Sequence, residues 1–233
     1  MNKLSKSFLI VIFSTIYLFL LTSYSPIVPS LTPSSIIIDN FSKTISKNVI
    51  PPGWEAKENE GKVDCSIAKH ETGNLVFHIK SKGTSVGIYK TLEIDIKQYP
   101  YFSWKWKVSK LPPNGDVRSK STDDQAGNIY LVFPGGFPEQ LRSKIISYLW
   151  ESNAPKGLMT TSPKRGNTKN VVVESGKEKL GEWITEKRNV CEDYKKLFNE
   201  EPVKTVKICI WIDSDDTESE AEAFYDDLMF SKN

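Results

Sequence analysis

The strongest constraint on the fold of this chain comes from residues 101–108, where apolar and polar side chains alternate. The two sets are Phe102, Trp104, Trp106 and Val108 against Tyr101, Ser103, Lys105 and Lys107. Because successive side chains of a β-strand point to opposite faces, the alternation predicts a strand with one face in a core and one in solvent. Two tryptophans on the core face predict a large apolar contact with an opposing sheet.

Further strand patterns follow at short intervals and are separated by Pro and Gly. They lie at residues 75–80, 92–97, 129–133, 171–173, 183–187, 206–212 and 224–230, and residues 144–150 fit either a strand or a short helix. One helix is predicted at 190–198, since Val190, Tyr194, Leu197 and Phe198 share a helical face and Pro202 follows. Thirteen Pro, thirteen Gly and 11% aromatic residues suit a turn-rich β protein. We predict an all-β fold of about ten strands, an antiparallel β-sandwich of jelly-roll type with one short helix.

The run from Val206 to Ile212 differs from the other strands because it is apolar on both alternating faces. This is typical of a strand that is covered on both sides. An acidic segment, 213–217, follows it directly, and a closing strand is predicted at 224–230. Cys209 is expected to be a small buried apolar side chain.

The N-terminal segment has the composition of a targeting signal. Lys3 and Lys6 precede an uncharged apolar core at 8–21, which predicts that residues 1–25 are a signal peptide or an N-terminal membrane anchor. Residues 26–35 are rich in Pro and Ser and form a predicted linker, and residues 36–233 form a single β-sandwich domain. With the two lysines on the cytoplasmic side, the domain is expected to be extracytoplasmic, either periplasmic or secreted, with membrane contact only through an uncleaved N-terminal segment.

The charge balance argues against a nucleic-acid partner. The chain has 31 Lys and Arg against 29 Asp and Glu, and two of the lysines belong to the leader, so the remainder is neutral. Two histidines, His70 and His78, make a zinc site improbable, and no phosphate-binding loop is present. The motif Gly83-Thr-Ser-Val-Gly87 matches a nucleophile elbow formally, but the histidines precede it, so a turn between two strands is the better interpretation.

Two groups of residues are candidates for a ligand site. Trp104 and Trp106 form either a core contact or, with companions such as Trp150, Trp183 and Trp211, a platform that stacks on sugar rings. The second group is the paired carboxylates Asp123 and Asp124 with the cluster Asp213, Asp215 and Asp216. Carboxylates in such pairs bind Ca²⁺, accept hydrogen bonds from sugar hydroxyls or act as acid and base in glycoside cleavage; the alternative is a solvated acidic rim.

Several blocks of the sequence, in order, resemble a bacterial family called domain of unknown function 3047. The blocks are Gly53-Trp-Glu55, Pro100–Val108, Asp123-Asp124 before 129–133, Tyr148-Leu-Trp150, Val172–Gly176, Trp183–Tyr194, Ile212–Thr217 and Tyr225-Asp-Asp227. Two positions depart from the family pattern, since Asn128 stands where arginine is common and Asp226 where glycine is common. The resemblance implies a secreted or periplasmic domain and supplies no established activity.

This family looks like the wider set of galactose-binding-type jelly rolls. Many of these have an acidic residue near the first strand and another near the last that share a structural Ca²⁺. The resemblance therefore implies Asp39 and Asp227 as ligands of a structural calcium ion. No other cofactor is expected.

Three functions are compatible with these observations. The first is a non-catalytic domain that binds carbohydrate or another cell-envelope ligand through Trp104, Trp106, Asp124, Arg188 and the loop 213–216. The second is a glycan-cleaving enzyme that uses two carboxylates, such as Asp124 with Asp213 or Asp215. The third is a structural or assembly component of the envelope without a small ligand.

Overall fold

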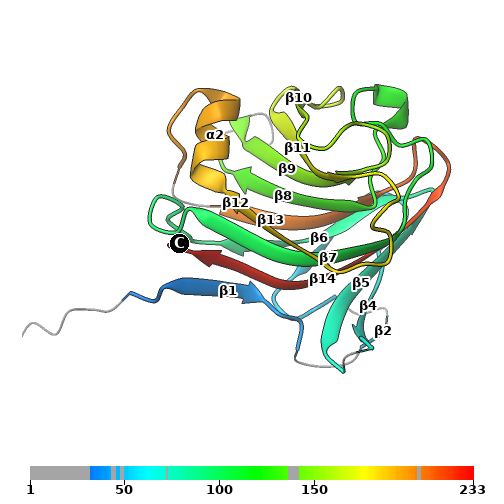
Figure 1. Ribbon diagram of the computed structural model, residues 1–233, viewed down its shortest axis with the longest axis horizontal. Coiled ribbons are helices and arrows are strands. Elements are labelled where there is room, and N and C mark those ends of the chain that lie inside the picture. Colours follow the sequence, from blue (N-terminus) through cyan, green and yellow to red (C-terminus); the bar gives the residue numbers. More distant parts are fainter. Residues whose placement is uncertain (1–31, 43–45, 48–49, 72, 136–141, 204–205) are drawn as a thin grey trace, which may run out of the picture. The chain divides into compact units, whose positions relative to one another are not determined.

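The computed structural model describes residues 32–42, 46–47, 50–71, 73–135, 142–203 and 206–233 (Figure 1). The chain divides into a unit of residues 1–32 and a unit from Pro33 to Asn233, and both sheets belong to the second. The predicted leader lies outside the described residues. Within those ranges, no helix has the length and apolar character needed to cross a membrane.

Two sheets face each other as stacked layers (Figure 1). The first has the strand order β12-β7-β14-β5-β4-β2, and β1 pairs with the end of β14. Its strands are β1 (Ser35–Asp39), β2 (Ser46–Lys47), β4 (Asp64–Lys69), β5 (Leu75–Lys82), β7 (Tyr101–Lys110), β12 (Ile184–Asn189) and β14 (Glu220–Ser231). Every neighbouring pair in this sheet is antiparallel.

The second sheet has the order β10-β11-β9-β8-β13-β6-β3. Its strands are β3 (Glu55–Glu60), β6 (Ser85–Leu92), β8 (Gly127–Phe133), β9 (Lys144–Glu151), β10 (Met159–Thr161), β11 (Thr168–Ser175) and β13 (Val206–Asp213). The pair β9 and β11 is parallel, and the other neighbours are antiparallel. Residues 144–150, which the sequence left open, are therefore a strand.

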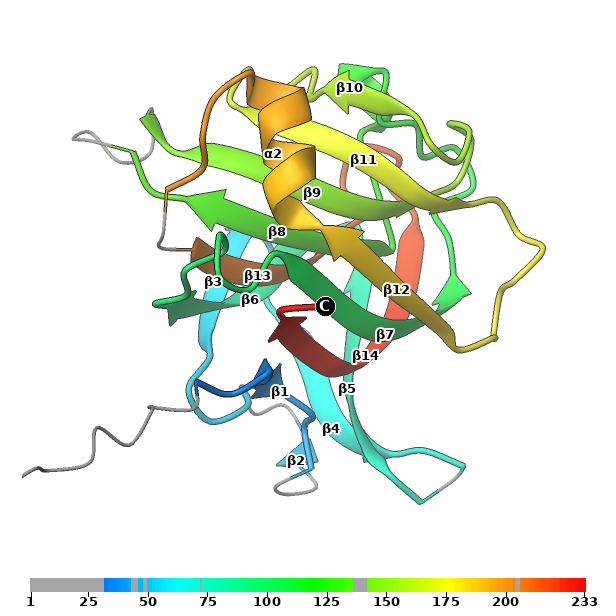
Figure 2. The ribbon, with the colours of Figure 1, turned by 60° about the vertical axis from the view of Figure 1, so that its left-hand side comes forward.

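The order of crossings explains how the sandwich closes. The chain passes from the first sheet to the second before β3, β6, β8 and β13, and it returns to the first sheet before β4, β7, β12 and β14. As a result, β13 is inserted between β6 and β8, and β14 between β5 and β7, so the last strands complete both sheets (Figure 2). The predicted β-sandwich of jelly-roll type is confirmed.

Large aromatic side chains fill the space between the layers. Trp104 and Trp106 of β7 are fully buried, as are Tyr148 and Trp150 of β9. The ring centroids of Trp104 and Tyr148 are 5.4 Å apart, and those of Trp106 and Trp150 are 5.8 Å apart. Of the two interpretations of Trp104 and Trp106, the core contact is the one that the structure shows.

The predicted helix is α2 (Val190–Phe198), which follows β12 directly. The side chain of Asn189 caps it by accepting a hydrogen bond from the backbone N–H of Glu192 at 3.1 Å. In its first turn, Asp193 forms a bidentate pair with Arg188, with Nε–Oδ2 at 2.9 Å and Nη2–Oδ1 at 2.6 Å. The Tyr148 hydroxyl also donates to Asp193, at 2.7 Å. Arg188 therefore joins α2 to the core.

Several local features differ from the sequence prediction. Residues 92–97 were predicted to form a strand, but β6 ends at Leu92 and a turn follows, in which the backbone N–H groups of Gln98 and Tyr99 donate to the Asp95 carbonyl. Ile94 and Ile96 are buried even so. The alternation of apolar and polar residues at 92–97 therefore comes from two side chains that anchor a loop. Strands β1, β2, β3, β4 and β10 were not predicted; in β3 every residue is exposed, and its apolar residue is Ala56.

Replacement of Trp104 by Ala should lower the free energy of unfolding by about 3–5 kcal/mol, because it empties a large fully buried volume. Chemical denaturation of the full-length protein in mild detergent measures this change. Trp183→Ala, which removes a partly exposed indole, is the matched control and should cost less. Equal losses in the two variants would contradict the placement of Trp104 in the core.

Candidate functional site

A groove of about 520 Å³ lies on the outer face of the second sheet. Ile208, Ile210 and Ile212 of β13 point into the core. The alternate side chains of the same strand, Lys207, Cys209, Trp211 and Asp213, line the groove. The outer face of β13 was predicted to be covered, and the structure shows instead that it forms the floor of a groove.

Three aromatic side chains line this groove, namely Tyr89 of β6, Tyr130 of β8 and Trp211 of β13. The ring centroids of Tyr130 and Trp211 are 6.1 Å apart. Trp211 is only 5% exposed and forms the floor, whereas Tyr89 and Tyr130 are half-buried. The planes of the Tyr130 and Trp211 rings are inclined by 36°, and adjacent aromatic rings on an open sheet face provide an apolar contact surface.

Gly87 makes room for the Trp211 indole. The two residues are opposite each other in the pairing of β6 with β13. A Cβ atom at Gly87 would lie 2.6 Å from the Trp211 ring and 2.3 Å from the carbonyl oxygen of Ile210. The glycine is therefore required by close approach of the ring and the neighbouring strand.

Polar side chains surround the aromatic floor. The lining includes Asp123, Gln125, Asp213, Thr168 and Asn170 together with four cationic residues, Lys57, Lys164, Arg165 and Lys207. Gln125 donates from Nε2 to Asp123 Oδ1 at 3.0 Å. Among the described residues, Thr168 Oγ1 and Asn170 Nδ2 have no hydrogen-bond partner. The groove thus combines aromatic rings with both donors and acceptors.

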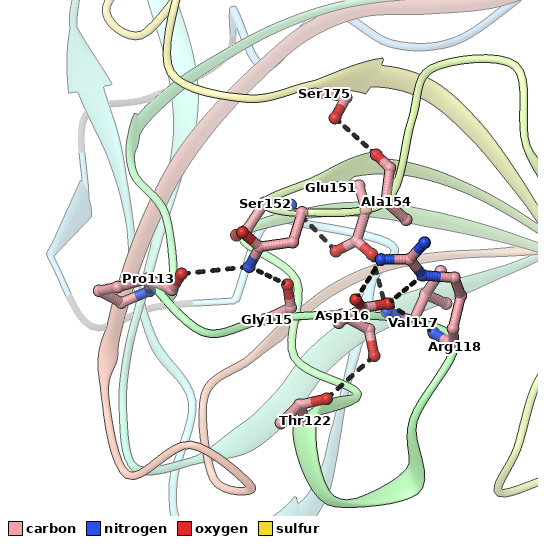
Figure 3. Close-up of polar contacts among 11 residues, drawn as sticks. Pro113, Gly115, Asp116, Val117, Arg118, Thr122, Glu151, Ser152, Ala154 and Ser175 are labelled. Carbon is pink, nitrogen blue, oxygen red and sulfur yellow. Dashed lines mark hydrogen bonds and ion pairs between the residues drawn. The ribbon is translucent and has the colours of Figure 1, made fainter.

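The loop between β7 and β8, residues 111–126, brings Asp123 and Asp124 to the end of the sandwich that lies beside the groove. Figure 3 shows how the loop is attached to the end of β9. The buried carboxylate of Glu151 accepts hydrogen bonds from the backbone N–H groups of Val117, at 2.7 Å, and Ser152, at 3.0 Å. Asn153 donates to the carbonyl oxygens of Pro113 and Gly115. Burial raises the pKa of Glu151 from 4.5 to about 7.

Asp124 joins this loop to the turn between β13 and β14. It is fully buried. Its Oδ1 accepts from the backbone N–H of Asp216 at 3.2 Å, and its Oδ2 accepts from the backbone N–H and the hydroxyl of Thr217 at 2.7 and 2.5 Å. Burial raises the pKa of Asp124, while these hydrogen bonds act in the opposite direction. The side chain holds two crossings of the chain together.

The carboxylates of Asp124, Asp213 and Asp215 lie close together, each with an oxygen within 4.8 Å of the others. Burial, together with the adjacent Asp215 carboxylate, raises the pKa of Asp213 to about 10. The neighbouring Asp213 carboxyl group lowers the pKa of Asp215. Asp216 forms an ion pair with Lys164. Burial also raises the pKa of Asp123 to about 6.

The structure distributes the predicted site residues over three places. Asp123 lines the groove, Asp124, Asp215 and Asp216 belong to the acidic cluster beside it, and Asp213 belongs to both. Trp104, Trp106 and Trp150 are fully buried between the sheets and cannot contact a ligand in the groove. The prediction that these three form a stacking platform is therefore wrong, and the aromatic residues that line the groove are Tyr89, Tyr130 and Trp211. The alternation of side chains along residues 207–213 places Trp211 and Asp213 on the same face of the strand. This sequence pattern could have indicated that the two residues line one surface.

Asp39 and Asp227, predicted to share a calcium ion, have separate partners. Asp39 Oδ1 accepts from the backbone N–H of Phe41 at 2.9 Å, and its Oδ2 accepts from the Trp54 indole at 2.8 Å. Asp227 forms an ion pair with Lys105 at 2.8 Å. Its backbone has φ +50°, at a bulge of β14 that turns this carboxylate toward β7.

Two further sequence candidates are placed by the structure. Ser85 begins strand β6 after a turn at Gly83, as expected for a turn between two strands. Cys209 lines the groove and is half-buried rather than fully buried. Burial raises the pKa of its thiol to about 12, so the thiol stays protonated at neutral pH and is a poor nucleophile.

The fold and the groove together define a β-sandwich with a candidate ligand site on the outer face of one sheet. The chain belongs to the family described as protein of unknown function (DUF3047), whose profile matches residues 52–229. This confirms the resemblance found in the sequence. A search of curated proteins found no significant match.

Several solved structures are similar to this chain. The family 11 carbohydrate-binding module of the cellulosomal cellulase Lic26A-Cel5E of Clostridium thermocellum is 10% identical, with a TM-score of 0.45, and the match covers 84% of this chain and 94% of the module. The family 30 module of Cel9D-Cel44B of Clostridium thermocellum is 8% identical, with a TM-score of 0.44 and coverages of 85% and 98%. The xyloglucanase domain of the effector NopAA from Sinorhizobium fredii is 7% identical, with a TM-score of 0.44 and coverages of 82% and 100%.

Glu151 should make stability depend on pH. Its pKa is higher in the folded protein than the 4.5 of an exposed glutamate, so its contribution to stability is fully present below pH 4.5 and is lost as pH rises through about 7. The rise from 4.5 to about 7 corresponds to about 3 kcal/mol. Urea unfolding between pH 4.5 and 8 should show wild type losing about this much stability relative to Glu151→Gln. Glu182→Gln, at an exposed carboxyl, is the control, and a flat difference for Glu151→Gln would contradict the assignment.

Proposed function

We propose that this protein binds carbohydrate non-catalytically in the groove on its second sheet. The observation that carries the proposal is the pair of rings of Tyr130 and Trp211, 6.1 Å apart, beside the carboxyl groups of Asp123 and Asp213. The C–H faces of sugar rings are apolar and stack on aromatic rings, while their hydroxyls need hydrogen-bond partners at the edge of the stack. The groove presents both kinds of contact within one surface.

The size and polarity of the groove support an oligosaccharide rather than an apolar ligand. A volume of about 520 Å³ lies within the range typical of ligand sites. The aromatic floor is bordered by the amides of Gln125 and Asn170 and the hydroxyl of Thr168. Such neutral groups, which donate and accept, suit sugar hydroxyls, which also do both.

The charges in the groove suggest which glycans to test. Lys57, Lys164, Arg165 and Lys207 outnumber the lining carboxyl groups, Asp123 and Asp213. Lys164 is neutralised by Asp216, and Lys207 lies 5.5 Å from the ring centroid of Tyr89. The remaining positive charge favours glycans that carry uronate groups, so acidic polysaccharides belong in the panel beside neutral ones.

Replacement of Tyr130 by Ala should weaken binding of the recognised polysaccharide about 10-fold, equivalent to about 1.4 kcal/mol, because it removes a half-buried ring from the groove. Calorimetric titration of the full-length protein in mild detergent with neutral and uronate-containing polysaccharides measures this. Phe224→Ala is the matched control, since Phe224 is a half-buried ring that stacks on His78 of the first sheet, with centroids 4.1 Å apart. Its affinity should remain within about 2-fold of wild type.

Three outcomes would overturn the proposal. Equal loss of affinity in Phe224→Ala would move the site to the first sheet. Release of new reducing ends during the titration would favour the glycan-cleaving alternative. Absence of binding to every glycan in the panel, with a folded protein, would favour an envelope assembly component.

We also propose that the β-sandwich acts outside the inner membrane, because Lys3 and Lys6 precede the apolar segment 8–21. Alkaline phosphatase, which is active only after export, should be active when fused to the C-terminus in a bacterial host. A fusion that lacks residues 1–25 is the control and should be inactive. Equal activity of the two fusions would rule out export through this segment.

A further inference from the structure

We propose that Asp124, Asp213 and Asp215 form a calcium-binding site at the end of the sandwich, beside the groove. The three residues come from different parts of the chain. Asp124 lies in the loop before β8, Asp213 ends β13, and Asp215 lies in the turn between β13 and β14. The inference does not depend on the glycan proposal, because it concerns only the chain's own carboxylates and a metal ion.

The separation of the carboxylates fits a shared ion. One oxygen of each residue lies within 4.8 Å of the oxygens of the other two. Calcium–oxygen distances are about 2.3–2.6 Å, so two ligand oxygens of one ion lie up to about 5 Å apart. The three oxygens can therefore contact a single ion without a large movement of the backbone.

The burial of Asp213 is an independent indication of a ligand. Asp213 is only 7% exposed, and its Oδ1 has no hydrogen-bond partner among the described residues. Oδ1 of Asp215 is also inaccessible and lacks a partner within the same ranges. A buried carboxylate oxygen without a donor is costly, and a bound cation would remove that cost.

Asp124 has acceptor capacity left for an ion. Its Oδ2 already accepts from the backbone N–H and the hydroxyl of Thr217. Its Oδ1 accepts only one hydrogen bond, from the backbone N–H of Asp216 at 3.2 Å. A carboxylate oxygen has two lone pairs, so Oδ1 can contact a cation and keep this bond. The hydrogen bonds also fix the direction of the carboxylate.

The local charge balance points the same way. Two more carboxyl groups, those of Asp123 and Asp216, lie next to the three proposed ligands in the sequence. Among the described residues, the cation that forms an ion pair with this cluster is Lys164, through Asp216. One lysine thus forms an ion pair with a group of five carboxyl groups, and a divalent cation would allow more of them to ionise together.

The chemistry of the ligands selects calcium. All three are carboxylates, which suit hard cations such as Ca²⁺ and Mg²⁺ rather than zinc, for which nitrogen and sulfur ligands are preferred. Mg²⁺ demands near-ideal octahedral geometry and usually keeps several waters, whereas Ca²⁺ accepts irregular arrangements of six to eight oxygens. A site assembled from two loops and a strand end fits the less demanding ion.

Calcium titration of the full-length protein in mild detergent tests this site. We expect one Ca²⁺ per chain by calorimetry. At a calcium concentration about 100-fold above Kd, the unfolding midpoint should rise by about 5–10 °C over the sample with chelator. Asp215→Asn should abolish the rise, and Asp213→Asn, which keeps the shape and removes one carboxylate ligand, should do the same. Mg²⁺ at equal concentration should produce a smaller rise.

The control variants are Asp39→Asn and Asp227→Asn, which should retain the calcium response. Absence of Ca²⁺ binding to the folded wild-type protein would overturn the proposal. A calcium response that survives in both Asp213→Asn and Asp215→Asn would also overturn it, and its loss in Asp39→Asn would place the ion near the first strand instead. If one ligand variant fails to fold, the other variant and the wild-type stoichiometry still decide between these outcomes.

Discussion

The hydrogen bonds of Asp124 are the interaction on which the arrangement of this end of the sandwich depends. Three crossings between the sheets meet here: the turn before β6, the loop before β8 and the turn before β14. Asp124 accepts from the backbone of the third crossing, and Ser214 of that crossing donates from its backbone N–H to the carbonyl of Thr84 in the first. Because β13 and β14 complete both sheets, fixing the turn between them fixes the registers on either side.

Such a meeting of loops explains why polar groups are concentrated at one end of an otherwise apolar interior. Backbone groups of the crossings are buried away from regular strand pairing and need side-chain partners. Carboxylates such as Asp124 and Glu151 supply acceptors for them. Burial then raises the pKa of both groups. Burying several carboxyl groups close together costs electrostatic free energy, and these groups lie beside the groove. The proposed cation would reduce that cost.

Much of the fold follows from local patterns, and the exceptions have physical reasons. Alternation located β5, β7 and β14, and helical spacing located α2. The same alternation at residues 92–97 marks a loop, because two buried isoleucines can anchor a turn as well as a strand. Strand β3 has no apolar residue larger than alanine, so its pairing with β6 comes from backbone hydrogen bonds that a sequence pattern does not display.

The sequence by itself determined that this chain forms a β-sandwich, that Trp104 and Trp106 share one face of a strand, and that carboxylates cluster after β13. Only the tertiary structure decided which aromatic residues are core and which line a groove. Trp104 and Trp106 are buried because β9 covers the inner face of β7, whereas Trp211 lies on the outer face of β13, which lines the groove. Tertiary structure also brought Asp124 to Asp213, about ninety residues later, because chain crossings far apart in sequence meet at one end of the fold.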